Sequence, residues 1–311
     1  MDEYLNTIAN LRIGSIPPVI WLMGAIFTAV LGALIGSFLN VCIYRIPLDQ
    51  SVVKPRSRCM SCGKLIPWYH NLPILSYFVL RGKCAYCKAT FGFRYAFVEM
   101  LTAFLFLSIW CMAPPGGGGP SFGLRALGEF AEAPVWMLFL SGLIIATFID
   151  FDHFIIPDSV SIGGMVAGVA LSALVPSMHG ETVWWQGLYS ATLGLAAGFI
   201  PLQTVRLAGT WFYRRSGRIG KDDYAMGFGD IKLVGAIGAF LGWQGAFFSI
   251  MSASLIGTLV ALPFVICGKK ALLDRIPFGP YLSLGAVIWL FWGTMITFGF
   301  WYFLMPPMPP M

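Results

Sequence analysis

The chain has 311 residues, of which 58% are hydrophobic and 11% are charged, and its net charge is +6. A soluble domain carries about 25% charged residues, so this composition excludes a water-soluble protein built around one compact core. The basic residues stand between apolar runs, as is typical of loops beside anionic lipid headgroups. We therefore expect an integral membrane protein that has membrane lipid, and no nucleic acid, as a partner.

Apolar runs that are long enough to cross a bilayer, which takes about 20 residues of helix, recur along the chain. The first is too long for a signal-peptide core and lacks a basic start, so we expect it to be retained. The sixth and seventh are separated only by residues 242–244 and could form a tight helical hairpin, since one helix would be too long. Small residues four apart, at 32/36, 164/168 and 194/198, predict close helix packing. The predicted spans are 18–43, 95–113, 134–150, 159–176, 186–208, 231–242, 244–267 and 280–304.

The distribution of Lys and Arg among the loops predicts the orientation, because basic loops stay in the cytoplasm. Loop 44–94 holds nine basic residues against Asp49 alone, and loops 209–230 and 268–279 are basic too. Loops 114–133 and 177–185 share a single basic residue. This pattern agrees with eight crossings and with both termini outside the cytoplasm.

The sequence therefore predicts an all-α polytopic membrane protein in three parts. The first is an N-terminal segment with the first transmembrane helix, the second a small cytoplasmic domain, and the third a seven-helix membrane domain. Their predicted bounds are 1–43, 44–94 and 95–311.

Four of the seven cysteines form two CxxC pairs, Cys59 with Cys62 and Cys84 with Cys87. Two such turns supply four thiolates, which is the ligand set of a tetrahedral structural Zn²⁺ site. Disulfides are disfavoured by a reducing cytoplasm, and a redox pair would need a thioredoxin-like unit. We therefore predict a structural zinc ion in the 44–94 domain, because a small domain with little hydrophobic core needs a cross-link of this kind.

Two acidic motifs lie at the predicted cytoplasmic edge of the membrane, where ionisable residues are usually functional. The first, IDFDHFIIPD, contains Asp150, and the second, GFGDIK, contains Asp230, 80 positions later. Two carboxylates that share a site cannot both ionise at low cost, so one keeps a proton. Such a pair can activate a water molecule and polarise a carbonyl group. The motifs therefore predict a catalytic pair, Asp150 and Asp230.

Five neighbouring residues are expected to support this pair. Gly227 and Gly229 remove side chains beside the second acid, which lets a substrate backbone approach. Lys232, Asp152 and Asp158 lie in the same motifs. For two of them alternatives stay open, because Asp158 follows a proline at a helix start and could be an N-cap, and Asp152 could face water or Lys232.

Together these motifs resemble the type IV prepilin peptidases, also called leader peptidase/N-methyltransferases. The resemblance covers residues 30–285, and its order and spacing are specific. Its pieces are GSFLNV and YRIP within 36–47, the two CxxC pairs, NLPILSY at 71–77, LRG at 80–82, Arg94, Tyr95, Glu99, both acidic motifs, and PFGP at 277–280.

The resemblance implies an aspartyl protease of the bacterial inner membrane with one catalytic Asp in each motif, carried here onto Asp150 and Asp230. The implied substrate is a prepilin or pseudopilin, cut on the carboxyl side of a glycine where its basic leader meets its apolar helix, at the cytoplasmic face. The resemblance also implies methylation of the new N-terminus with S-adenosylmethionine. No nucleotide-binding fingerprint assigns that cofactor to particular residues.

Two other functions remain open at the level of sequence. A transporter or channel would use Asp150 and Asp230 to relay protons or ions, and it predicts acids near the bilayer midplane and internal symmetry. A non-enzymatic assembly factor of a pilus or secretion machine would dock through its zinc domain and would tolerate changes at both acids.

Overall fold

The structure is a computed structural model that describes residues 18–112, 132–216, 227–266 and 277–304. The described residues form helices and loops without any β-strand, which confirms the predicted all-α class. They divide into two compact units, 18–112 with 132–145 and 146–304 with its gaps. The predictions for both termini, for loop 114–131 and for the charges of 217–226 and 267–276 lie outside the described residues.

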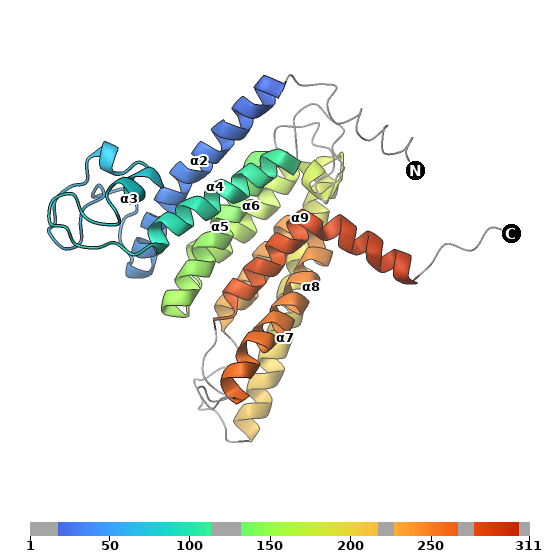
Figure 1. The fold of residues 1–311 in the computed structure, drawn as a ribbon. Coiled ribbons are helices and arrows are strands. Elements are labelled where there is room, and N and C mark those ends of the chain that lie inside the picture. The colour runs from blue at the N-terminus through green and yellow to red at the C-terminus, as the bar shows by residue number, and fades with distance from the viewer. Residues whose placement is uncertain (1–17, 113–131, 217–226, 267–276, 305–311) are drawn as a thin grey trace. The chain divides into compact units, whose positions relative to one another are not determined.

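Six described helices are long and apolar enough to cross a membrane. A seventh, α6 (Asp158–Leu174), is apolar but shorter. Gly242, with φ 73° and ψ 179°, interrupts α8 and divides it into two helical segments. With α6 and both segments of α8, the described helical segments match the eight predicted spans (Figure 1). The six long helices are α2 (Pro18–Arg45), α4 (Arg94–Met112), α5 (Glu132–His153), α7 (Trp184–Arg215), α8 (Phe228–Ile266) and α9 (Gly279–Leu304).

In the first unit α2 and α4 pack as an antiparallel pair whose contact runs along glycines of α2. A Cβ at Gly32 would lie 2.7 Å from Cα of Ala103, and one at Gly36 would lie 2.8 Å from Cα of Glu99. Because the partner's number falls as the glycine's rises, the helices run in opposite directions. The small residues at 32 and 36 therefore let the two backbones approach closely, as predicted.

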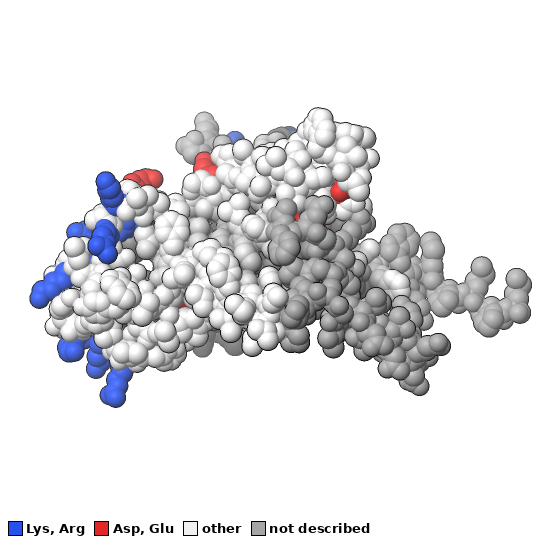
Figure 2. Space-filling model, turned by 90° about the horizontal axis from the view of Figure 1, so that it is seen from above, with Lys and Arg blue, Asp and Glu red and all other residues white. Residues whose placement is uncertain are grey.

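A mostly irregular segment, residues 46–93, joins α2 to α4. Beside this segment, Asn40 Nδ2 of α2 donates to the carbonyl of Tyr95 in α4 at 3.0 Å. The N–H of Ile74, in the middle of the segment, donates to Glu99 Oε2 of α4 at 2.7 Å. Lys and Arg side chains gather on this part of the surface (Figure 2). The segment contains the 3₁₀ helices η1 (Ile46–Leu48) and η2 (Trp68–His70) and the short helix α3 (Leu75–Val79).

In the second unit α7 and the first segment of α8 touch through their backbones. A Cβ on either Gly194 or Gly238 would overlap the carbonyl oxygen of the other, and a Cβ at Gly198 would lie 2.6 Å from the carbonyl oxygen of Val234. These two helices are therefore antiparallel, and the predicted small pair 194/198 forms their contact.

Helix α6 packs on the other predicted small pair and runs parallel to the first segment of α8. A Cβ at Gly164 would lie 3.1 Å from Cβ of Ala236, and one at Gly168 would lie 2.8 Å from Cβ of Ala239. The N-terminal ends of α6 and α8 consequently lie at the same end of the unit, and the C-terminal end of α7 lies there too.

The second segment of α8 runs back alongside α9. Gly257 lies beside Tyr281, and Gly245 lies beside Trp289, so this segment and α9 are antiparallel. The positive φ at Gly242, which a residue with a side chain rarely adopts, makes the reversal between the two segments. The predicted helical hairpin is therefore confirmed, and α9 also begins at the end where α6 and α8 begin.

A histidine contacts this reversal from the 3₁₀ helix η3 (Pro176–His179). The His179 ring donates a hydrogen bond to the backbone of Ala239, near the end of the first α8 segment. Its Nδ1 lies 3.8 Å from where a Cβ at Gly242 would stand. Burial lowers the pKa of His179 from 6.5 to about 4, because desolvation disfavours the imidazolium cation.

We predict that the stability of the protein falls as the pH is lowered from about 6.5 towards 4. In that window the unfolded histidine binds a proton that the folded one does not. At about 1.4 kcal/mol per pH unit, protonation opposes folding by up to about 3 kcal/mol.

Unfolding of the detergent-solubilised protein at about pH 7 and about pH 4.5 measures this effect. The His179→Gln variant is the control, since glutamine does not titrate. Wild type is expected to lose more stability on acidification than the variant does, and an equal loss in both would contradict the prediction.

Candidate functional site

Asp150 lies in the last turn of α5 and is only 4% exposed. Its Oδ2 accepts the backbone N–H of Gly279, the first residue of α9, at 2.9 Å. The first N–H groups of a helix lack partners within the helix and favour a negatively charged acceptor. The buried carboxylate and the start of α9 therefore satisfy each other.

Only glycine fits at the start of α9. A Cβ at Gly279 would lie 2.8 Å from Oδ2 of Asp150 and 3.2 Å from Cδ1 of Ile156. The first distance is shorter than real Cβ contacts, so a side chain would push α9 away from the acid. Gly279 was not among the site residues predicted from the sequence, although it belongs to the PFGP motif.

Asp230 lies in the first turn of α8 and interacts electrostatically with Asp150. Ile156 is the neighbour that the starts of α8 and α9 share: a Cβ at Gly229 would lie 3.1 Å from Cβ of Ile156, and Ile156 is itself buried. The fold thus brings the two predicted carboxylates into one site, lined by the starts of two helices and the loop after α5.

The two glycines before Asp230 make contacts within the protein. A Cβ at Gly227 would lie 3.1 Å from Oδ2 of Asp230, and Gly229 faces Ile156 as described. The approach of a substrate backbone at these glycines stays a prediction. Both glycines let the loop and the carboxylate pack tightly at the start of α8.

Lys232 forms an ion pair with Asp158, the first residue of α6. The lysine is nearly buried at 13% exposure, whereas Asp158 is 64% exposed. Pro157 occupies the N-cap position of α6, so the capping interpretation of Asp158 is wrong. Asp152 is exposed, and two residues of helix place it about 200° around α5 from Asp150.

An aromatic ring stands between this ion pair and α7. Nζ of Lys232 lies 4.6 Å from the ring centroid of Phe228, and Cζ of Arg206 lies 4.8 Å from it. Phe199 packs edge-on against the same ring. Cation–π contacts of this kind attach the start of α8 to α7. Arg206 has no motif around it, so sequence reasoning offered no signal for it.

The four predicted zinc ligands, Cys59, Cys62, Cys84 and Cys87, converge in the first unit. Their Sγ atoms all lie within 4.8 Å of one another, and Sγ of Cys59 and Sγ of Cys87 are 3.8 Å apart. Zn–S bonds of about 2.3 Å in a tetrahedron place sulfurs about 3.8 Å apart. This donor set fits a zinc ion, and the described cysteines form no disulfide.

The two CxxC turns have the same backbone geometry. The N–H of Gly63 donates to the carbonyl of Cys59 at 2.8 Å, and the N–H of Lys88 donates to the carbonyl of Cys84 at 3.0 Å. Gly63 and Lys88 both have positive φ. The two turns thus form a repeated structural unit in which the first cysteine of each is buried.

Backbone N–H groups inside each turn point at its first sulfur. Hydrogen bonds from Cys62 and Ser61 lower the pKa of the Cys59 thiol to about 6. Hydrogen bonds within the second turn, from Cys87 first, also lower the pKa of Cys84. Each turn therefore favours the thiolate of its first cysteine, and the thiolate is the form that binds metal.

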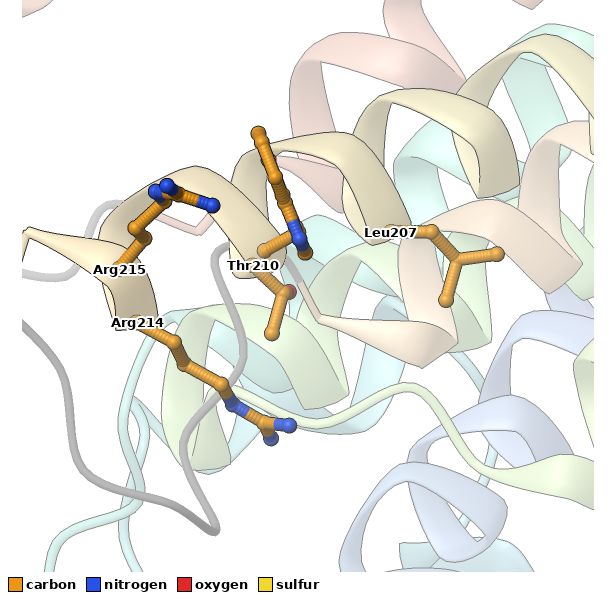
Figure 3. A pocket seen from close by; sticks show the side chains of 5 residues that line it. Leu207, Thr210, Arg214 and Arg215 are labelled. Carbon is orange, nitrogen blue, oxygen red and sulfur yellow. The ribbon is translucent and has the colours of Figure 1, made fainter.

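A cavity of about 460 Å³ lies along the C-terminal end of α7. All of its lining side chains come from this one helix (Figure 3). The Arg215 guanidinium lies 5.5 Å from the ring centroid of Trp211. With two arginines and a tryptophan, the cavity is suited to an anionic or aromatic group. The lining residues are Leu207, Thr210, Trp211, Arg214 and Arg215.

Two family models match the chain. The model of the bacterial Peptidase A24 N-terminal domain matches residues 30–113, which include the cysteine cluster. The model of the type IV leader peptidase family matches residues 137–262, which include Asp150 and Asp230.

Several relatives carry the name prepilin leader peptidase/N-methyltransferase. The protein from Myxococcus xanthus is 35% identical over 83% of this chain and 68% of its own length. Those from Aeromonas hydrophila and Pseudomonas aeruginosa are 33% and 31% identical, over 85% and 87% of this chain and 89% and 91% of their own. No solved structure matches the chain.

We predict that Gly279→Ala destabilises the protein by about 1–3 kcal/mol, the usual effect of overpacking, because the new methyl group would displace either α9 or Asp150. Gly299→Ala is the matched control on the same helix, since a Cβ there meets nothing within 4 Å. Unfolding of both variants in detergent tests this, and equal stabilities would show that the site accommodates a side chain at 279.

Proposed function

The chain belongs to the type IV leader peptidase family, and on that premise we propose that Asp150 and Asp230 are the catalytic pair of its peptidase activity. The protein is a multi-pass enzyme of the bacterial inner membrane that processes prepilins. The transporter and assembly-factor interpretations are not favoured by these relatives. The residues that cleave the prepilin, the side of the membrane on which they lie and the cofactors are the subject of the proposals below.

The surroundings of Asp150 support the assignment of the catalytic pair. Asp150 interacts electrostatically with Asp230. It is also oriented by the N–H of Gly279, 129 residues further along the chain. A buried carboxylate that is oriented by a backbone donor and stands beside a second carboxylate is the arrangement that aspartyl chemistry needs.

The hydrogen bond to Gly279 also suggests where a shared proton can reside. An amide N–H can only donate, which disfavours a proton on Oδ2 of Asp150. The shared proton then resides on Asp230 or on Oδ1 of Asp150. With the proton on Asp230, the Asp150 carboxylate is free to act as general base.

In the proposed reaction Asp150 takes a proton from a water molecule, whose oxygen attacks the scissile carbonyl carbon. Asp230 donates its proton to the carbonyl oxygen, which stabilises the tetrahedral intermediate. As the C–N bond breaks, the leaving amine takes the proton from Asp150 and a hydroxyl proton of the intermediate returns to Asp230, which restores the pair. Neither a metal ion nor a covalent intermediate is needed for these steps.

We place the pair at the cytoplasmic face on the basis of charge. Arg214 and Arg215 end α7 at the end of the second unit where α6, α8 and α9 begin. At the opposite end the described loop 175–183 has no Lys or Arg. The segment 46–93 is basic as well, and basic loops favour the cytoplasm. A prepilin would then lie with its apolar helix in the bilayer and its basic leader in the cytoplasm.

The relatives' names include an N-methyltransferase activity, and we propose that this chain also methylates the new N-terminus with S-adenosylmethionine. The two guanidinium groups of the cavity on α7 would repel the cationic sulfonium. That cavity is therefore not suited to this cofactor.

We infer that the cysteine cluster holds one structural Zn²⁺. Four sulfurs at tetrahedral spacing leave no open coordination position, so the ion would stabilise the fold and take no part in the cleavage. The segment 46–93 has little apolar core of its own, since its buried apolar residues are Cys59 and Cys84. The metal would supply the cross-link that hydrophobic packing does not.

Asp150→Asn and Asp230→Asn are each expected to lower the rate of prepilin cleavage by about 10²–10⁴-fold, the usual contribution of a general acid or base. The matched control is Asp49→Asn, an exposed acid in a left-handed conformation that asparagine tolerates. Cleavage of a membrane-embedded pilin precursor by the purified variants measures the effect. Wild-type rates of cleavage in both the Asp150→Asn and the Asp230→Asn variants would reject the assignment of the catalytic pair.

The purified protein is expected to contain one zinc ion per chain by elemental mass spectrometry. Cys59→Ser and Cys84→Ser should each lower the zinc content and the unfolding temperature, because the metal then loses a thiolate and its stabilising energy. Cys111→Ser, which changes a free cysteine on α4, is the control. Full zinc content in both cluster variants would contradict the inference.

A further inference from the structure

The short helix α3 carries an apolar face that the described protein leaves uncovered. Leu75, Phe78 and Val79 are 62%, 58% and 77% exposed. Their spacing of three and four residues places them on one side of the helix. Three large apolar side chains side by side on a helix of five residues are unusual in contact with water and indicate an interaction surface.

The position of α3 along α4 indicates what covers this face. The Ile74 N–H, directly before α3, is held by Glu99 Oε2 at 2.7 Å. Glu99 is the sixth residue of α4, so at 1.5 Å per residue it lies about 7 Å inside the helix. Gly36, nine residues before the end of α2, packs on the same glutamate. Because a helical side chain points towards the N-terminus of its helix, the start of α3 is thus held beside the first turns of α4 and the last turns of α2.

Aromatic rings connect α3 to the exposed side of α4. The ring centroids of Tyr77 and Phe93 are 5.8 Å apart, and those of Phe93 and Phe97 are 6.5 Å apart. Phe93 and Phe97 are 51% and 44% exposed, and Phe97 belongs to the predicted span. Tyr77 lies on the side of α3 opposite Leu75, Phe78 and Val79, so these rings attach the back of α3 to a side of α4 that meets lipid, where aromatic residues are enriched.

The charges around α3 complement an anionic surface. Arg81 and Lys83 follow the helix directly, and the segment 46–93 contains Asp49 as its single acid. Figure 2 shows the Lys and Arg side chains gathered on this part of the molecule. An apolar face bordered by basic residues is the pattern of helices that lie in the headgroup region of anionic membranes.

We propose that α3 is an interfacial membrane anchor that inserts Leu75, Phe78 and Val79 into the leaflet beside α4, with anionic lipid as its partner. The anchor would fix the cysteine cluster at the bilayer surface. The level at which Glu99 holds the helix favours lipid over a protein partner, because the headgroup region surrounds the ends of a transmembrane helix. This proposal does not depend on the assignment of the catalytic pair.

A photo-crosslinking side chain tests the proposal in the full-length protein. The exposed Val79 is replaced by p-benzoylphenylalanine, and the variant is reconstituted into vesicles of phosphatidylethanolamine and phosphatidylglycerol. After illumination, mass spectrometry identifies what is attached. Phe104, which is 64% exposed within α4, is the lipid-facing reference, and Met60, which is 67% exposed on the first CxxC turn, is the comparison outside the anchor.

The expected result is a phospholipid adduct at position 79 with a yield within about threefold of that at 104, and about tenfold above that at 60. Adducts at 104 but none at 79 would overturn the proposal. A crosslink from 79 to a second copy of the chain or to an added pilin precursor would also overturn it, because the face would then bind protein.

A second set of vesicles separates the charge contribution from simple insertion. In phosphatidylcholine alone the yield at 79 is expected to fall severalfold, while the yield at 104 stays unchanged, because no basic residue needs to hold a spanning helix in place. Equal yields at 79 in both kinds of vesicle would overturn the role of anionic lipid in the anchor.

Discussion

The hydrogen bond from the Gly279 N–H to Asp150 is the contact on which the acidic site depends. A carboxylate that is only 4% exposed is costly unless its charge is compensated, and the N–H at the start of α9 compensates it. A cation beside Asp150 would neutralise the charge that general-base chemistry needs. A helix N-terminus stabilises the carboxylate and leaves it able to accept a proton, provided that position 279 has no side chain.

This contact requires that α6, α8 and α9 all begin at one end of the second unit. The reversal at Gly242 divides α8 into two antiparallel segments, and the paired glycines at 194 and 238 let α7 lie against the first of them. Ile156 then fills the space between the starts of α8 and α9. Backbone contact between helices fixes their relative depth closely, and so it fixes where the two acids meet.

The membrane helices and the segment 46–93 reach stability by different means. In both units long apolar helices pack closely through their glycines, as is general for membrane helices. The segment 46–93 has few buried apolar residues, and two equivalent turns bring four cysteine sulfurs together in it. Its exposed apolar residues, those of α3 above all, would be stabilised by the bilayer. Metal and lipid would thus take the place of a hydrophobic core.

The sequence by itself determined the membrane class, the eight helical segments, the hairpin at 242–244 and the four cysteines that converge, because hydropathy, glycine and CxxC spacing act locally along the chain. It also singled out both acids, as costly charges at helix ends. The tertiary structure decided that Lys232 pairs with Asp158, that Ile156 and Phe228 pack around the site, and that Gly279 donates to Asp150. Those contacts join segments far apart in sequence. They are determined by the depth and register at which helices pack, and no local sequence pattern encodes either.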